Sequence, residues 1–250
     1  MYPMNEIIAH NEEFAPTVSK EVEFMLKAGI HLGHSKSKNH PAMKPYIYGV
    51  RNTIAILDLI KTEEKLKKAM DFIREIAARG GMVLFVGTRP GTRRAILDIA
   101  DKTQMPYFIE RWIGGSLTNY KMIHKRIEQM ELLEKEKETG GFDKYTKKER
   151  TRKEDEIARL RRFFNGLRKL TRMPDAVVVL DTTHDTTAVR EAKKMKIPVV
   201  ALCDSNANID LIDFPIPSND HALSAVTYML NKFAEAIEEG KQQMLEKKAE

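Results

Sequence analysis

The sequence predicts a doubly wound α/β domain from which a two-helix hairpin projects. Three observations predict it: short apolar runs rich in branched residues alternate with segments of helical periodicity, the alternation is interrupted once between Ile109 and Ala176, and the interruption carries a helical pattern of its own. Strands that alternate with helices form a parallel sheet covered on both faces, because each right-handed crossover packs a helix against the sheet.

Five runs are predicted to be buried parallel strands, since short branched runs without alternation are typical of strands covered on both faces. They are Thr53–Leu59, Met82–Val86, Pro106–Ile109, Ala176–Leu180 and Pro198–Leu202. Helices are expected over residues 62–79, 92–102, 185–196 and 218–239. The first has Thr62 as its expected N-cap and ends at Gly80 and Gly81.

The interruption predicts an antiparallel helical hairpin over residues 116–172. Its two apolar stripes are Ile123, Ile127, Met130 and Leu133, and, after Gly140 and Gly141, Ile157, Leu160, Phe164 and Leu167. Spacings of three and four residues are typical of the seam of a two-helix coiled coil. The predicted organisation is therefore an α/β domain over residues 1–115 and 173–240, the hairpin, and a polar C-terminal tail over 241–250.

The excess positive charge is concentrated in the hairpin. Residues 116–172 hold 17 Lys/Arg and 10 Asp/Glu, whereas the rest of the chain holds 25 and 26. The first arm, residues 121–138, holds five basic and five acidic residues. The second arm with its approach, residues 144–172, holds 12 basic and four acidic residues. A local positive field of this kind is typical of a protein that binds a polyanion. A solvated charged surface is the alternative interpretation.

Two glycine-containing segments follow strands, where α/β proteins often bind ligands. The first, Gly87–Arg94, opens a helix and offers arginines to a phosphate, but it lacks the P-loop ending and the second glycine of the dinucleotide fingerprint. A tight turn at Gly87 is therefore favoured over nucleotide binding. In the second, Arg111–Asn119, no acid, base or nucleophile accompanies Trp112, so packing of this ring at the base of the hairpin is favoured.

Five residues would share a metal ion if the N-terminal loop folds over the carboxyl edge of the sheet: His31, His34, Asp181, His184 and Asp204. The two N-terminal histidines lack the i, i+4 spacing of a helical zinc pair, so hydrogen-bonding loop residues are the favoured interpretation and no metal is predicted. The aspartates also occupy positions where α/β enzymes carry catalytic groups, but such carboxylates equally satisfy loop backbone. No nucleophile accompanies them. No catalytic residue and no cofactor are therefore predicted.

The composition limits the cellular location. No stretch approaches the roughly 20 apolar residues of a membrane span. Residues 1–14 carry three glutamates and no basic, apolar leader. The single cysteine, Cys203, excludes an intramolecular disulfide and a multi-cysteine zinc site. We expect a cytoplasmic protein with no membrane partner and no small-molecule substrate.

Eight short motifs occur in order between about Phe24 and Gly240: Leu26–His34, Met43–Asn52, Leu84–Thr88, Arg111–Asn119, Gly141–Glu149, Met173–Ala176, Ile197–Val200 and Ile216–Asp220. In their order and spacing they resemble the bacterial family of the S-two protein of the small ribosomal subunit. The resemblance implies a flavodoxin-like, five-stranded parallel sheet in the order 2-1-3-4-5 with a coiled-coil hairpin inserted after the third strand. It also implies a structural constituent of the 30S-type subunit that binds its ribosomal RNA and neighbouring ribosomal proteins, including the S-one protein.

Cations of the hairpin are the predicted RNA-binding residues, because they would neutralise RNA phosphates. Near the tip they are Lys144, Lys147, Lys148, Arg150, Arg152 and Lys153, and along the second arm Arg159, Arg161, Arg162, Arg168 and Arg172. Arg89, Arg93 and Arg111 are second-tier candidates. The competing interpretation is an enzyme that binds a nucleotide or sugar phosphate and dimerises through the hairpin.

Overall fold

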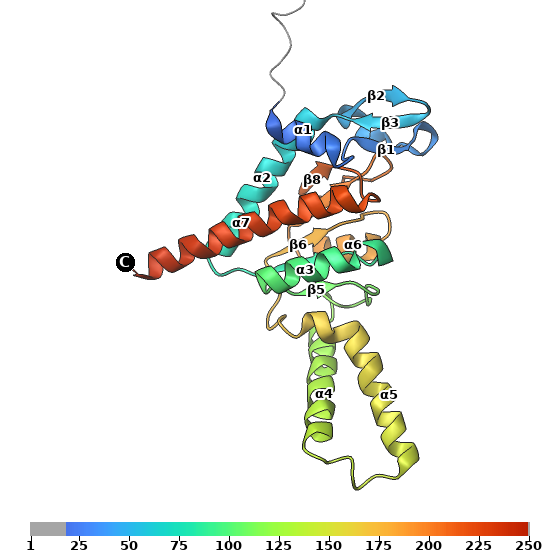
Figure 1. Ribbon diagram of the computed structural model, residues 1–250, viewed down its shortest axis with the longest axis vertical. Helices are drawn as coiled ribbons and strands as arrows, with labels where there is room; N and C mark the ends of the chain where they lie inside the picture. Colours follow the sequence, from blue (N-terminus) through green and yellow to red (C-terminus); the bar gives the residue numbers. More distant parts are fainter. Residues whose placement is uncertain (1–18, 250) are drawn as a thin grey trace, which may run out of the picture.

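The computed structural model describes residues 19–249, which form two sheets, helices on both faces of the larger sheet and a projecting hairpin (Figure 1). The N-terminal stretch where no secretory signal is expected, and Glu250 of the predicted tail, lie outside the described residues. The helices are α1 (Lys20–Lys27), α2 (Leu59–Ala78), α3 (Arg93–Thr103), α4 (Tyr120–Glu138), α5 (Lys147–Phe164), α6 (Thr186–Lys194) and α7 (Leu223–Ala249). None of these helices is long and apolar enough to cross a membrane.

The strands are β1 (Leu32–Ser35), β2 (Ile47–Arg51), β3 (Ile54–Leu57), β4 (Val83–Val86), β5 (Tyr107–Phe108), β6 (Ala176–Val179), β7 (Val199–Cys203) and β8 (Phe214–Pro217). Short 3-10 helices are η1 (Lys36–Lys38), η2 (Pro41–Tyr46), η3 (Pro90–Thr92) and η4 (Asn165–Leu167). Among the described residues, five strands run parallel in the spatial order β5-β4-β6-β7-β8. Numbered along the chain this is 2-1-3-4-5, so the expected order is confirmed.

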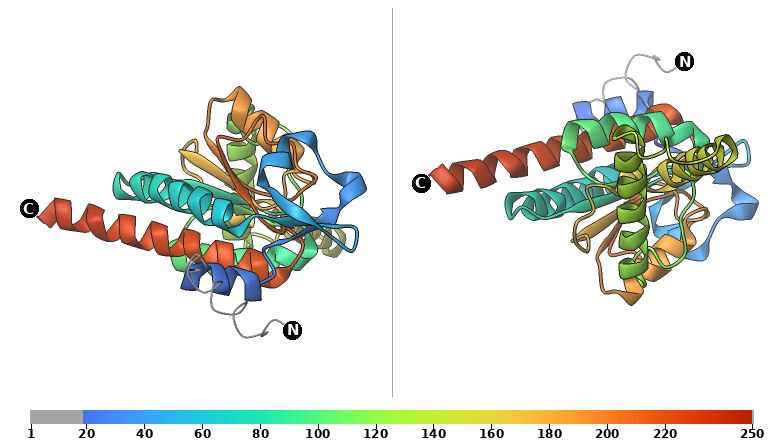
Figure 2. Two further views of the ribbon diagram at one scale, coloured as in Figure 1. Left: turned by 90° about the horizontal axis from the view of Figure 1, so that it is seen from above. Right: turned by 90° about the horizontal axis from the view of Figure 1, so that it is seen from below.

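Helices cover both faces of the parallel sheet, which explains why its central strands are buried throughout. Side chains of α2, α3 and α7 join one core, together with Phe85 and Val178. Side chains of α6 and of the hairpin join the other, together with Leu84 and Val177. On the first face, α2 and α7 run side by side (Figure 2). The predicted α/β class is confirmed, and the hairpin is rooted in the second core.

One predicted strand is wrong, because Thr53–Leu59 does not enter the parallel sheet. Its middle part is β3, the central strand of a separate antiparallel sheet in the order β1-β3-β2, which lies at the end of the molecule opposite the hairpin (Figure 1). Asn52 and Thr53 join β2 to β3 with φ angles of 48° and 67°. Two consecutive left-handed residues are typical of a tight hairpin turn. This apolar run therefore pairs with its immediate neighbour in the chain.

The fifth parallel strand is β8, which the sequence does not predict. Pro215 and Pro217 argue against a strand, because proline donates no hydrogen bond to the ladder. The strand lies at the edge of the sheet and pairs only with β7, a position that tolerates missing donors. As a consequence, the hairpin follows the second strand of the sheet in chain order, β5, not the third.

Two helix boundaries also differ from the prediction. The N-cap of α2 is Asp58, whose Oδ1 accepts from the backbone amide of Ile60 at 3.0 Å. Thr62, the predicted cap, is buried inside the helix, and its hydroxyl donates to the carbonyl of Pro217 at 2.8 Å. The last helix begins at Leu223, after the predicted start, and continues through Ala249 into the predicted tail.

Candidate nucleic-acid interface

Helices α4 and α5 pack against each other through the predicted seam. Ile123, Ile127 and Met130 of α4, and Ile157, Leu160 and Phe164 of α5, are buried. Apart from Ile157, these side chains belong to the core that covers one face of the parallel sheet. The predicted seam is confirmed, and the base of the hairpin is continuous with the domain while its far end projects into solvent (Figure 1).

One carboxylate organises the tip of the hairpin. Glu136 accepts from Lys153 Nζ at 3.1 Å and from the hydroxyl of Tyr145 at 3.0 Å, and it pairs with Lys144 Nζ at 3.3 Å. The hydrogen bond from Lys153 is the main reason why the pKa of Glu136 lies below its ordinary value. The same ammonium lies 4.3 Å from the ring centroid of Tyr145. Two predicted RNA-binding lysines therefore also shape the turn.

A second carboxylate, Glu134 of α4, binds arginines of the second arm. It accepts from Arg161 and, at 2.7 Å, from Arg168. Burial raises the pKa of Glu134, but the hydrogen bonds from the two arginines outweigh burial and hold it below its ordinary value. These two predicted RNA-binding arginines therefore hold the helices of the hairpin together.

Other predicted cations are paired within the protein as well. These pairs are Arg93–Glu110, Arg162–Glu110, Arg150–Asp143, Arg172–Asp175 and Arg89–Asp181. Five candidates have no carboxylate oxygen within 4.0 Å among residues 19–249: Lys147, Lys148, Arg152, Arg159 and Arg111. All five are exposed, and all but Arg111 lie on α5. The predicted RNA-binding cations therefore fall into two groups, those that pair with a carboxylate and those that do not.

The base of the hairpin is held by Glu191 of α6, a buried carboxylate. Its Oε1 accepts from the indole Nε1 of Trp112 at 3.1 Å and from the amide of Gly115 at 2.7 Å. Its Oε2 accepts from the amides of Leu117 and Thr118 and from the hydroxyl of Thr118. Burial raises the pKa of Glu191, but these hydrogen bonds outweigh it and the pKa lies below its ordinary value. The prediction that Trp112 packs at the base of the hairpin is confirmed, because it belongs to this core.

The metal candidates lie at the carboxyl edge of the parallel sheet without forming one site. His34 Nδ1 is 2.8 Å from Asp204 Oδ2. Asp181 accepts two amide hydrogen bonds from its own loop, as favoured from the sequence, and His184 bonds a threonine hydroxyl after β4. The Nδ1 atom of His31 is buried and has no hydrogen-bond partner among the residues that the structure describes. Nowhere between residues 19 and 249 do three His, Cys, Asp or Glu side chains converge as metal ligands.

A carboxylate that the sequence does not indicate, Asp220, lies at the same edge. Its Oδ1 is 3.5 Å from Arg89 Nη1, and the same arginine pairs with Asp181. Burial, followed by the charges of Asp181 and Asp204, raises the pKa of Asp220 to about 8. Arg89 therefore lies between two buried carboxylates.

Comparison with known proteins identifies the family. The family model described as "Ribosomal protein S2" matches residues 25–240. The chain belongs to the Ribosomal protein S2 family. A relative named "Small ribosomal subunit protein uS2" from Coprothermobacter proteolyticus is 42% identical over 218 residues, which cover 87% of this chain and 81% of that protein. One of the same name from Dehalococcoides mccartyi is 41% identical over 216 residues, covering 86% and 88%.

Members of the Ribosomal protein S2 family are structural proteins, so the enzyme interpretation does not hold. The resemblance of the motifs is confirmed over nearly the whole described chain. For this S2-family chain, the carboxylates at the strand ends bind loop amides, a histidine and an arginine.

In this S2-family chain, replacing Asp220 with Asn should change how stability depends on pH. The folded carboxyl has a pKa of about 8, above its unfolded value. Its contribution to stability is therefore complete below about pH 4 and is lost as the pH rises towards 8. The Asn variant should accordingly gain stability relative to the parent between pH 5 and pH 8.

Urea unfolding of parent and variant at several pH values in that range measures this difference. The neighbouring ionisable side chains His34, His221, Asp181 and Asp204 are present in both proteins, so their direct contributions to the difference largely cancel. Parallel stability profiles for the two proteins would contradict the prediction.

Proposed function

We propose that this chain is a structural constituent of the small ribosomal subunit and binds ribosomal RNA mainly through four cations of α5. They are Lys147, Lys148, Arg152 and Arg159, and we call them the free cations. The observation that carries the proposal is that all four are exposed and, within the described chain, have no carboxylate partner. A paired cation must give up a partner before it binds a phosphate, whereas a free one releases only counterions from the RNA.

Three of the four free cations lie along one side of α5, and Lys147 precedes them in the first turn at a different angle around the helix. Lys148, Arg152 and Arg159 are separated by four and seven residues, which correspond to about one and two turns of the helix. Asp155 interrupts this side, so the positive field is strongest near the tip and near the base. Cations spaced along a rod suit recognition of phosphates and of helix shape, which is how double-stranded RNA is mostly read.

The remaining predicted cations stay secondary candidates for RNA contact. Besides Arg111, they are the paired residues Lys144, Arg150, Lys153, Arg161, Arg162, Arg168, Arg172, Arg89 and Arg93. Each paired residue would have to exchange a carboxylate for a phosphate. An exposed ion pair contributes a small free energy, and losing it makes the net gain from binding a phosphate smaller than for a free cation.

We further propose that α4 and the α/β body face neighbouring ribosomal proteins, the S-one protein among them. The first arm has balanced charge, and its exposed side chains include two large apolar ones, Met122 at 49% and Leu132 at 68% exposure. Exposed apolar side chains on a neutral helix suit contact with protein better than contact with phosphates. A protein that works on the ribosome in this way belongs in the cytoplasm, as expected from the sequence.

Replacing the free cations together with Gln tests the proposal. Each phosphate contact contributes a slope of about 0.7 to 0.9 to the dependence of log affinity on log salt, so four lost contacts should lower the slope by about 3. Binding to small-subunit RNA near 0.1 M salt should weaken by about tenfold or more. Filter binding over a salt series and co-sedimentation with small subunits measure both effects.

A matched variant controls for net charge. Lys36, Lys38, Lys102 and Lys194 are also exposed, lie outside the hairpin and have no carboxylate partner in residues 19–249. Their combined replacement with Gln removes the same charge. Equal loss of salt slope in the two variants would reject the assignment to α5.

A further inference from the structure

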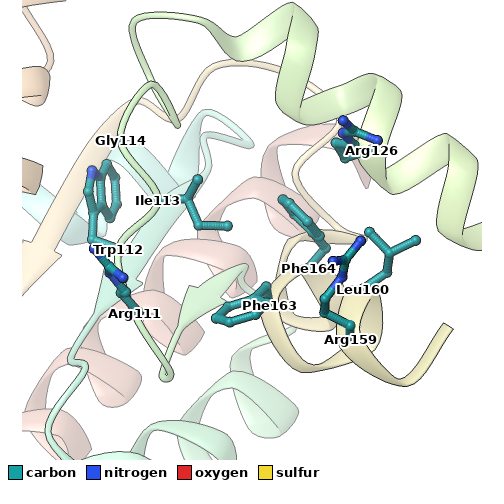
Figure 3. A pocket seen from close by; sticks show the side chains of 9 residues that line it. All are labelled: Arg111, Trp112, Ile113, Gly114, Arg126, Arg159, Leu160, Phe163 and Phe164. Carbon is teal, nitrogen blue, oxygen red and sulfur yellow. The ribbon is translucent and has the colours of Figure 1, made fainter. Parts of the chain in front are cut away.

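A cavity of about 400 Å³ lies at the base of the hairpin, between the loop after β5 and the helices α4 and α5 (Figure 3). This volume is within the range of ligand-binding pockets. Its apolar lining includes Ile113 from the loop and Leu160, Phe163 and Phe164 from α5. Of the two phenylalanines, Phe163 is only half-buried, so part of its ring remains accessible.

Three arginines accompany this apolar lining. Arg111 lies on the loop, Arg126 on α4 and Arg159 on α5, so the cations come from three different segments (Figure 3). All three are exposed, and none has a carboxylate within 4.0 Å in the described part of the chain. No acidic side chain lines the cavity. Arg126 Nη1 also donates to the amide oxygen of Gln129 at 2.8 Å, a neutral acceptor. Aromatic and aliphatic surface surrounded by guanidinium groups without carboxylate partners is complementary to a flat ligand that carries negative charge.

We propose that this cavity accepts one unpaired nucleotide of RNA, with its base stacked on Phe163 and its neighbouring phosphates bound by Arg111, Arg126 and Arg159. The inference rests on the proposed function and adds to it a site for a single base. A base within a duplex cannot enter, because both of its faces are already stacked, whereas bases of loops and bulges are free to leave the helix.

An apolar peptide fits the cavity less well than a nucleotide. Covering the cavity with an apolar segment would remove water from three guanidinium groups without supplying an acceptor, and burying an unpaired charge is costly. A nucleotide supplies the apolar face and the phosphate acceptors together. The arrangement therefore favours RNA as the occupant.

Two RNA hairpins of equal length test the proposal with the full-length protein. One carries a single bulged 2-aminopurine nucleotide, and the other is fully paired. We expect the bulged RNA to bind about 5- to 100-fold more tightly, the range that stacking of one base on an aromatic side chain provides. We also expect the fluorescence of 2-aminopurine to be quenched on binding.

Substitutions at Phe163 test the stacking contact. Phe163→Ala should abolish both the preference and the quenching, whereas Phe163→Tyr, which keeps an aromatic ring, should retain them. Circular dichroism of each variant verifies that the helical hairpin is folded. A preference that persists in folded Phe163→Ala would overturn the inference.

Two arginines of α5 provide a matched pair that does not depend on the core. Arg159 lines the cavity, and Arg152, two turns away, lies outside it. Arg159→Gln should reduce binding of the bulged RNA several-fold more than binding of the paired RNA. Arg152→Gln should reduce both equally, because it removes only a phosphate contact. An equal effect of the two substitutions on the preference would overturn the inference.

The outcomes separate this inference from the proposed function. Equal affinity for the two RNAs, with salt dependence intact, would overturn the nucleotide site and leave the proposed function standing. Absence of salt-dependent binding to either RNA would overturn both. A third outcome is that the parent does not prefer bulged RNA, yet folded Phe163→Ala is incorporated less into small subunits. This outcome would point to a protein occupant of the cavity and would also overturn the nucleotide site.

Discussion

Replacing Glu191 with Ala should lower the free energy of unfolding by about 3 to 5 kcal/mol, the largest effect expected for a single side chain outside the apolar core. The carboxylate accepts five hydrogen bonds, from the indole of Trp112 and from the loop that leads into α4. Alanine leaves these donors without an acceptor in a site that is only 8% exposed at Glu191. The loss is larger than for an ordinary hydrogen bond because the acceptor is charged.

Chemical denaturation measures the loss, and two other substitutions control for its cause. Glu191→Gln keeps the size of the side chain but presents an NH₂ group to amide donors, so it should also destabilise, by less than Ala. Lys194→Ala on the same helix removes an exposed side chain and should change stability by no more than about 0.5 kcal/mol. Trp112 is the only tryptophan, so its emission reports directly on this loop. If Glu191→Ala were as stable as Lys194→Ala, the prediction would be contradicted.

The sequence does not reveal this role of Glu191, because its partners lie 73 to 79 residues earlier in the chain. On the predicted helix over residues 185–196, a single glutamate among lysines has the pattern of a solvated residue. Only the tertiary fold turns it towards the backbone amides of the loop after β5. Local patterns carry no information about such distant partners.

The elements that could be predicted are those with local patterns. The seam of α4 and α5 follows directly from the spacing of its apolar residues, and the central strands follow from their branched runs. Which sheet an apolar run joins cannot be predicted from the composition of the run itself. Thr53–Leu59 has the composition of a buried strand, yet its pairing with β2 is decided by the turn at Asn52.

The RNA-binding candidates show the same limit. Counting charges locates the hairpin and its second arm, but Arg161 and Arg168 differ from Arg152 and Arg159 only in facing Glu134 across the seam. Arg126 is absent from the predicted set because the first arm is neutral as a whole. That it lines the same cavity as Arg159 appears only in three dimensions (Figure 3). The packing of the helices therefore determines which cations have a carboxylate partner and which do not.

Replacing Gly166 with Ala should destabilise the protein by about 1 to 3 kcal/mol, because the new methyl group meets backbone. Gly166 lies in η4, where the second arm returns to the sheet. A Cβ atom there would overlap the carbonyl oxygen of Tyr107 and lie 2.6 Å from a ring carbon of the same residue. Since a carbonyl oxygen of β5 cannot rotate away as a side chain does, either the edge strand or the end of the hairpin must move.

Gly91→Ala is the matched control, because a Cβ at Gly91 would meet nothing within 4 Å. Thermal and urea unfolding should place this variant at or slightly above the stability of the parent, since alanine restricts the unfolded chain. A displaced hairpin would also carry the free cations away from their phosphates. Folded Gly166→Ala should therefore bind small-subunit RNA more weakly than Gly91→Ala, although both retain every cation. Equal stability and equal RNA affinity of the two variants would show that the contact of η4 with β5 does not set the direction of the hairpin.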